Sequence, residues 1–142
     1  MKHTIIAVDL AKSVFEIAVS HQPGRVAERH RLSRGKFLRF FAQRQPALVL
    51  MEACSSAHYW AREIEQFGHS VVLLPPHQVR PYVGRNKTDQ AAKGILEAHR
   101  NEEIQPVPVK SVTQQTLAAL HRFRSAWLIP TSTVRRGMAH RR

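Results

Sequence analysis

Three acidic residues stand at the ends of elements of regular structure that the sequence predicts. Asp9 and Glu52 each end an apolar run long enough for a buried strand, and Asp89 begins a helix directly after a basic loop. A carboxylate beside a buried strand is costly unless a cation compensates it. Carboxylates suit hard divalent cations, and two such ions about 3.5–4 Å apart clamp the attacking and leaving oxygens of a phosphodiester. The three acids therefore predict a metal site for phosphodiester chemistry.

Each acid also has an ordinary explanation, which the sequence leaves open. An acid at the end of a strand is often simply solvated. Asp89 lies in the first turn of its predicted helix, where the helix dipole favours a negative charge. The joint pattern of three acids in this order is less easily explained in this way, but the spacing alone leaves both interpretations open.

The chain is strongly basic. Its 142 residues include 22 lysines and arginines against 10 acids, which gives a net charge of +12 and an isoelectric point near 11.3. Such a charge favours polyanions, because each neutralised phosphate releases condensed counterions. Four basic residues near the acids are the predicted nucleic-acid contacts, with a solvated basic face as the alternative for each: Lys12, Arg80, Arg85 and Lys87.

Other classes of protein fit the sequence less well. The basic residues are scattered rather than set on one amphipathic helix, so an anionic membrane surface is a poorer partner. The first apolar stretch is broken by Asp9 after five residues, too early for a signal peptide or a membrane span. Cys54 is the one cysteine, which excludes an internal disulfide and indicates a reducing, intracellular compartment. Cys54 and His58 alone do not make a zinc signature, and we expect Cys54 to be packed.

The order of predicted elements indicates an α/β fold with a mixed sheet. We expect strands at 4–10, 14–20, 25–32, 47–51 and 70–74, and helices at 36–43, 56–67, 89–100 and 112–128, with a turn at 21–24 and a short helical turn at 78–82. Three antiparallel strands followed by alternating helices and strands is the order of an RNase H-like core. We expect that domain at 1–100, a connector and C-terminal helix at 101–128, and an unmatched basic tail at 129–142.

Several blocks of the sequence resemble one family over about residues 4–128. The blocks include Ile6-Ala7-Val8-Asp9-Leu10-Ala11-Lys12, Met51-Glu52-Ala53-Cys54-Ser55-Ser56-Ala57-His58-Tyr59-Trp60, Gly68-His69-Ser70-Val71-Val72-Leu73-Leu74-Pro75-Pro76 and Asn86-Lys87-Thr88-Asp89. They resemble the DEDD transposases of bacterial insertion sequences, which are relatives of the pilin-gene invertase. The N-terminal domain of this family is similar to the RuvC Holliday-junction resolvase.

This resemblance implies a RuvC-like fold that uses Mg²⁺ or Mn²⁺ to cleave and join DNA strands during transposition in the bacterial cytoplasm. Asp9, Glu52 and Asp89 match the first three of the four family acids, and so take the catalytic and metal-binding roles. The fourth acid has no match, because the chain reads Asp89-Gln90-Ala91-Ala92-Lys93 where the family has Asp-x-x-Asp. Glu97 lies eight residues beyond Asp89, roughly 12 Å along a helix, which is too far to replace the fourth acid. We therefore expect an impaired metal site.

The resemblance also ends early. Family members continue through a coiled-coil region into a C-terminal domain with a catalytic serine, whereas the match here fades near Leu128. The first hypothesis is thus an N-terminal part of a transposase, impaired in catalysis. The alternatives are a non-catalytic basic module that binds nucleic acid and a product with no selected role. The expected partners are DNA, with structured RNA as an open alternative, and a second copy or a full-length transposase.

Overall fold

The computed structural model describes residues 4–83 and 91–128, and the chain forms two compact units, Met1–Val109 and Lys110–Arg142. Within the described residues no helix is long and apolar enough to cross a membrane. The described elements of the first unit are, in chain order, β1 (Ile5–Leu10), β2 (Val14–Ser20), β3 (Glu28–Ser33), α1 (Arg34–Ala42), β4 (Leu48–Glu52), α2 (Ala57–Glu65), β5 (Ser70–Leu74), α3 (Pro76–Val79), the 3-10 helix η1 (Arg80–Tyr82) and α4 (Ala91–His99).

The five strands form one mixed sheet in the order β3-β2-β1-β4-β5, which confirms the predicted fold class. A three-residue link joins β1 to β2, so these strands pair as an antiparallel hairpin, and β3 extends the meander. The crossovers through α1 and α2 bring β4 and β5 back parallel to β1. Parallel pairing in the centre of the sheet places the carboxyl ends of β1 and β4 at the same edge.

The turn after β2 is longer than the sequence predicts. The Arg25 N–H donates to the Gln22 carbonyl at 3.2 Å, and Gly24 has a φ of +75°, which glycine adopts at little cost. The Ser20 hydroxyl donates to the carbonyls of Gln22 and Arg25 at 2.6 and 2.8 Å. Because of these bonds, residues 25–27 belong to the turn rather than to a strand. The prediction of a strand from Arg25 is therefore wrong, and β3 begins at Glu28.

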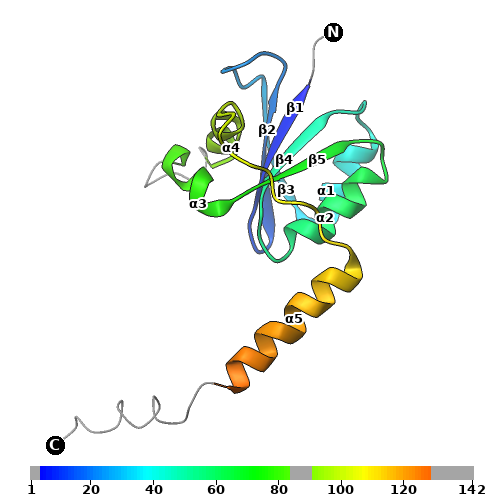
Figure 1. Ribbon diagram of the computed structural model, residues 1–142. Helices are drawn as coiled ribbons and strands as arrows, with labels where there is room; N and C mark the ends of the chain where they lie inside the picture. Colours follow the sequence, from blue (N-terminus) through cyan, green and yellow to red (C-terminus); the bar gives the residue numbers. More distant parts are fainter. Residues whose placement is uncertain (1–3, 84–90, 129–142) are drawn as a thin grey trace, which may run out of the picture. The chain divides into compact units, whose positions relative to one another are not determined.

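Helices cover both faces of the sheet (Figure 1), and the two faces carry different cores. On the face covered by α1 and α2, the packing is aromatic, with Phe15, Phe37 and Trp60 in edge-to-face contacts. On the face covered by α4, small side chains dominate at the sheet–helix contact: Ala7, Ala18, Ala92 and Ala98. The helix can lie close to the sheet there, because little side-chain volume separates the two backbones.

The predicted connector after α4 is part of the first compact unit. Ile104 is buried in the core under α4, whereas Val107 and Val109 pack against the aromatic core on the other face. The Val107 N–H donates to the Leu73 carbonyl at 2.8 Å, in an isolated antiparallel bridge with β5. The segment therefore crosses the edge of β5 and supplies it with a backbone partner.

The described part of the second unit is the helix α5 (Val112–Trp127). Ser111 and Gln114 form a capping box at its start, in which each side chain accepts from the other's backbone N–H. The predicted helix at 112–128 is confirmed to within one residue. Several large apolar residues of this segment are exposed: Val112, Leu117, Leu120, Phe123, Trp127 and Leu128.

Candidate functional site

Asp9 and Glu52 emerge together at the carboxyl ends of β1 and β4. The last registered pair of these two parallel strands is Val8 with Met51, so the next residue of each strand is one of the two acids. Side chains alternate between the faces of a sheet. Asp9 therefore shares the face of Ala7, and Glu52 shares the face of Leu50, which is the face covered by α4. The sequence prediction that the sheet brings these two strand ends together agrees with this register.

Both acids line a pocket of about 1010 Å³ between the sheet edge and α4. Arg80 of η1 and His77 of α3 also line this pocket, as does Ala91 at the start of α4. Pro75 and Pro76 end β5 and start the short helix that carries these residues, which explains why the chain turns toward the acids. The pocket thus combines two carboxylates with an exposed guanidinium.

The acids of this pocket are poorly compensated. Burial raises the pKa of Asp9. Burial and the negative charge of Asp9 raise the pKa of Glu52, while Arg80 opposes this shift. Within the described part of the chain, ion pairs at distances of up to 4.0 Å are made by other acids, namely Glu16, Glu28 and Glu97. A cation placed between Asp9 and Glu52 would relieve both the desolvation and the mutual repulsion.

The remaining predicted site residues are placed only in part. Asp89, Arg85 and Lys87 lie outside the described residues. Lys12 is exposed in the link that follows β1, at the same end of the strand as Asp9. Among residues 4–83 and 91–128, no group of three or more histidines, cysteines or acids is close enough to hold a metal ion.

The first residues of α4 lie where the family resemblance expects the fourth acid. Ala92 is buried in the core beneath the helix, together with Ile95. Gly94 lies against the preceding segment so tightly that a Cβ there would be 2.8 Å from the Tyr82 carbonyl oxygen and 2.8 Å from Val83 Cγ2. Glycine at this position lets α4 approach η1 and close one side of the pocket.

The prediction of a packed cysteine is wrong. Cys54 is exposed, and its Sγ lies 3.4 Å from Ser56 Oγ. The reason is the turn between β4 and α2, in which the Ala57 N–H donates to the Cys54 carbonyl at 3.2 Å and the cysteine side chain lies on the surface. His58, in contrast, is buried in α2.

One acid beside the site was missed from the sequence. Glu16 of β2 is paired directly opposite Asp9, so both side chains lie on the face covered by α4. The side chain of Glu16 is 17% exposed, and Arg31 Nε lies 4.0 Å from its Oε1. The hairpin itself carries the signal: with a three-residue link between the two strands, a residue near the end of β1 faces one near the start of β2.

Known proteins resemble the chain in both sequence and fold. A protein of Pseudomonas aeruginosa described as a probable family 20 transposase is 46% identical over 121 residues, which are 84% of this chain and 36% of that protein. The transposase for insertion sequence element IS1328 of Yersinia enterocolitica is 40% identical over 124 residues, covering 87% of this chain and 37% of that transposase. By sequence, the chain is similar to one part of these insertion-sequence transposases. It spans about a third of the length of these curated relatives. No protein-family model matches it.

The fold of the chain is similar to that of a solved structure. The structure of RuvC from Thermus thermophilus matches 73% of this chain and 99% of RuvC, with a TM-score of 0.51 and 12% sequence identity. The five-stranded mixed sheet with helices on both faces is therefore the RNase H-like, RuvC-like fold that the element order predicts. The predicted resemblance to insertion-sequence transposases and the predicted fold are both confirmed.

Proposed function

We propose that the chain provides the carboxylate site of a transposase that cleaves and joins DNA strands with Mg²⁺ or Mn²⁺ in the bacterial cytoplasm. The observation that supports this most is the pair Asp9 and Glu52 at neighbouring parallel strand ends, in a pocket where burial raises the pKa of both. The sequence relatives are transposases, which makes DNA the substrate of choice. By the family resemblance, Asp89 is the third acid of the same site.

The residues present fit a hard divalent cation. Mg²⁺ in phosphoryl-transfer sites commonly takes one or two carboxylates and completes its shell with water and substrate phosphate. Asp9 and Glu52 would supply these carboxylates. The bound ion would polarise a phosphate oxygen and stabilise developing negative charge. Arg80 lines the same pocket and attracts the phosphate backbone toward the acids.

The missing fourth acid weakens this site. Where the resemblance expects a carboxylate near the start of α4, the described helix presents Ala91 to the pocket and Ala92 to the core. Loss of one hard ligand lowers the affinity for the cation, so we expect little strand cleavage by this chain alone. Cation-dependent DNA binding is therefore a more sensitive test of the site than strand cleavage.

The test compares DNA binding by the full chain in Mn²⁺ and in chelator, using branched and insertion-end duplexes. We expect Mn²⁺ to strengthen binding by the wild type, because the cation links the carboxylates to a phosphate. Asp9→Asn should abolish this strengthening, while Glu65→Gln, which removes an exposed acid of α2, should keep it. An equal Mn²⁺ effect in both variants would contradict the proposal. Strand nicking that is lost in Asp9→Asn would show that the site is not impaired.

A second candidate is a basic module that binds nucleic acid without catalysis, which the net charge of +12 favours. It predicts salt-sensitive binding to DNA or structured RNA that responds neither to the cation nor to Asp9→Asn. The same titrations therefore distinguish the two candidates.

We also propose that the chain associates with a second copy or a full-length transposase through α5. Val112, Leu120, Phe123 and Trp127 recur at helical spacing along one face, and Trp127 is 88% exposed. Phe123→Glu should shift the chain to a monomer in sedimentation experiments. Arg122→Glu makes a larger change of charge on a different face, and should leave the oligomer intact.

A further inference from the structure

A row of charged residues crosses the sheet at the proposed site. Asp9 is in register with Glu16 on β2, and Glu16 is in register with Arg31 on β3. On the other side of Asp9, Glu52 ends the neighbouring strand β4. Residues directly opposite one another point to the same face, so the row lies on the face covered by α4. Three acids stand side by side, with Arg31 at one end of the row.

The two ends of this row are both cationic. Arg80 lines the pocket of Asp9 and Glu52 and acts electrostatically on Glu52. Arg31 Nε lies 4.0 Å from Glu16 Oε1 at the opposite end. Adjacent strands are about 4.8 Å apart, which puts the backbone of Arg31 roughly 10 Å from that of Asp9, two strands away. Each arginine is therefore within reach of a polyanion that occupies the acid pocket.

The ion pair between Glu16 and Arg31 has little value for stability. The side chain of Arg31 is 75% exposed, and exposed pairs contribute little because water and salt screen them. The ion pair instead positions Arg31, because Glu16 keeps this flexible side chain at the edge of the acid row. On this edge strand, the residues of the same face are Arg29, Arg31 and Ser33, so the strand adds no further acid there.

We propose that Arg31, positioned by Glu16, contacts a backbone phosphate of DNA bound at the Asp9–Glu52 pocket. Phosphates approaching three aligned carboxylates are repelled, and a guanidinium at each end of the row offsets this repulsion. Arg80 binds the DNA backbone on the β5 side of the row, and Arg31 binds it at the β3 edge. This inference rests on the proposed function, because it takes DNA as the ligand of the pocket.

The test measures binding of a short labelled duplex DNA by the full chain over a range of salt concentrations. Arg31→Ala should weaken binding by about fivefold and lower the slope of log K against log salt by about one, as loss of one phosphate contact does. Arg39→Ala is the matched control. It removes the same charge from an exposed position on α1, which covers the opposite face of the sheet. We expect it to change binding by less than about twofold at the same salt.

The positioning role of Glu16 has its own readout. In a Glu16→Gln background the guanidinium is no longer held, so Arg31→Ala should cost less than about twofold there, and a double-mutant cycle isolates this coupling. Equal costs in both backgrounds would overturn the role of Glu16. Equal effects of Arg31→Ala and Arg39→Ala would overturn the contact while wild-type binding upholds the proposed function. Absence of wild-type DNA binding would overturn both. The melting temperature of each variant confirms that it is folded.

Discussion

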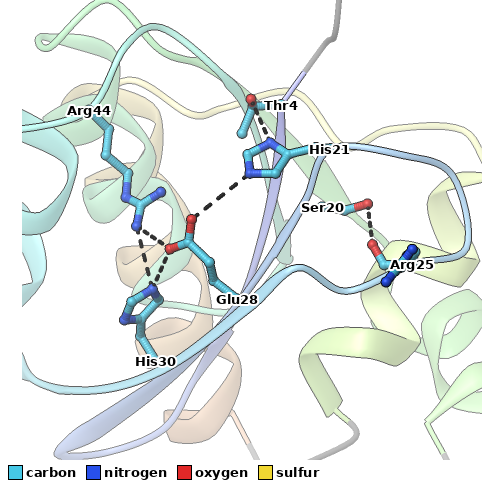
Figure 2. Close-up of polar contacts among 7 residues, drawn as sticks. All are labelled: Thr4, Ser20, His21, Arg25, Glu28, His30 and Arg44. Carbon is cyan, nitrogen blue, oxygen red and sulfur yellow. Dashed lines mark hydrogen bonds and ion pairs between the residues drawn. The ribbon is translucent and has the colours of Figure 1, made fainter.

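The pKa values of acidic residues shift in opposite directions on the two faces of the sheet. On the face covered by α1 and α2, Glu28 is paired with Arg44 at 2.6 Å and with His30 at 2.8 Å, as Figure 2 shows. Hydrogen bonds from Arg44 and His30 lower the pKa of Glu28 from 4.5 to about 2. On the face covered by α4, burial raises the pKa of Asp9 and of Glu52.

This difference distinguishes a structural acid, Glu28, from the two acids of the proposed site. Glu28 joins β3 to the segment after α1, and His21 extends the contacts from Glu28 to Thr4, the residue before β1 (Figure 2). Its charge is already satisfied within the protein. Burial leaves the ionised forms of Asp9 and Glu52 unfavourable, which an added cation would relieve, and such shifts are concentrated at functional sites. The cores of the two faces differ as well, since the face covered by α1 and α2 is aromatic and the face covered by α4 is rich in alanine.

The largest expected effect tests whether the aromatic face carries the stability. Phe37 is fully buried and contacts the rings of Phe15, Phe41 and Trp60. Phe37→Ala should lower the free energy of unfolding by about 3–5 kcal/mol, because it leaves a cavity that the neighbours cannot fill. Urea denaturation measures this change. A loss below about 1 kcal/mol would show that this face does not dominate the stability.

The next effect tests the close packing of the α4 face. Gly94→Ala places a methyl group 2.8 Å from backbone and side-chain atoms of the segment before α4, so it should destabilise the chain by about 1–3 kcal/mol. Gly35→Ala is the matched control in α1, where a Cβ meets nothing within 4 Å. We expect that control to stabilise by up to about 1 kcal/mol through helix propensity. Equal effects of the two substitutions would refute the tight approach of α4.

A smaller effect tests how much the paired carboxylate of Glu28 stabilises the fold. A carboxylate whose folded pKa is lowered stabilises the fold above its unfolded pKa, and this contribution disappears as pH falls from about 4.5 to about 2. Because Glu28 and its partners are partly exposed, we expect Glu28→Gln to cost only about 1 kcal/mol at neutral pH. Unfolding of both proteins across this pH range measures the difference. A gap that persists unchanged down to pH 2 would contradict the account.

The smallest effect has the opposite sign. Asp9 is half-buried with a raised pKa, so its ionised form is less favourable in the folded chain than in the unfolded one at neutral pH. Asp9→Asn should therefore raise the free energy of unfolding by roughly 0.5 kcal/mol in the absence of divalent cations, as replacement of strained site residues often does. Thermal denaturation in chelator checks this. Destabilisation by Asp9→Asn would place Asp9 with Glu28 as a structural acid.

The sequence predicted the elements well because their signals are local. Apolar runs such as Ile5–Leu10 and Ser70–Leu74 indicate strands wherever they pack, and Gly68, with a φ of +85°, follows α2 in a conformation that glycine favours. The start of β3 was misplaced, because the Ser20 hydroxyl ties down the turn through backbone carbonyls that no sequence pattern reveals. Exposure of Cys54 depends on a turn of the same kind.

The site was predictable only where it depends on strand ends. The two apolar runs that end in Asp9 and Glu52 indicated that a sheet could bring these side chains together, and the register agrees. Glu16 was missed because its relation to Asp9 depends on the register of the hairpin rather than on any residue beside it. The ion pair of Glu28 with Arg44 joins residues sixteen apart, which composition cannot indicate.

The central claim is that Asp9 and Glu52 bind a divalent cation, and the most direct test is the thermal unfolding of the full chain with and without Mn²⁺. A ligand that binds only the folded state stabilises it by RT ln(1 + [L]/Kd), which is about 2.7 kcal/mol at a hundredfold excess over Kd. The account predicts that Mn²⁺ raises the melting temperature of the wild type and of Glu28→Gln, but not that of Asp9→Asn or Glu52→Gln. An equal shift in all four proteins, or no shift in the wild type, would contradict it.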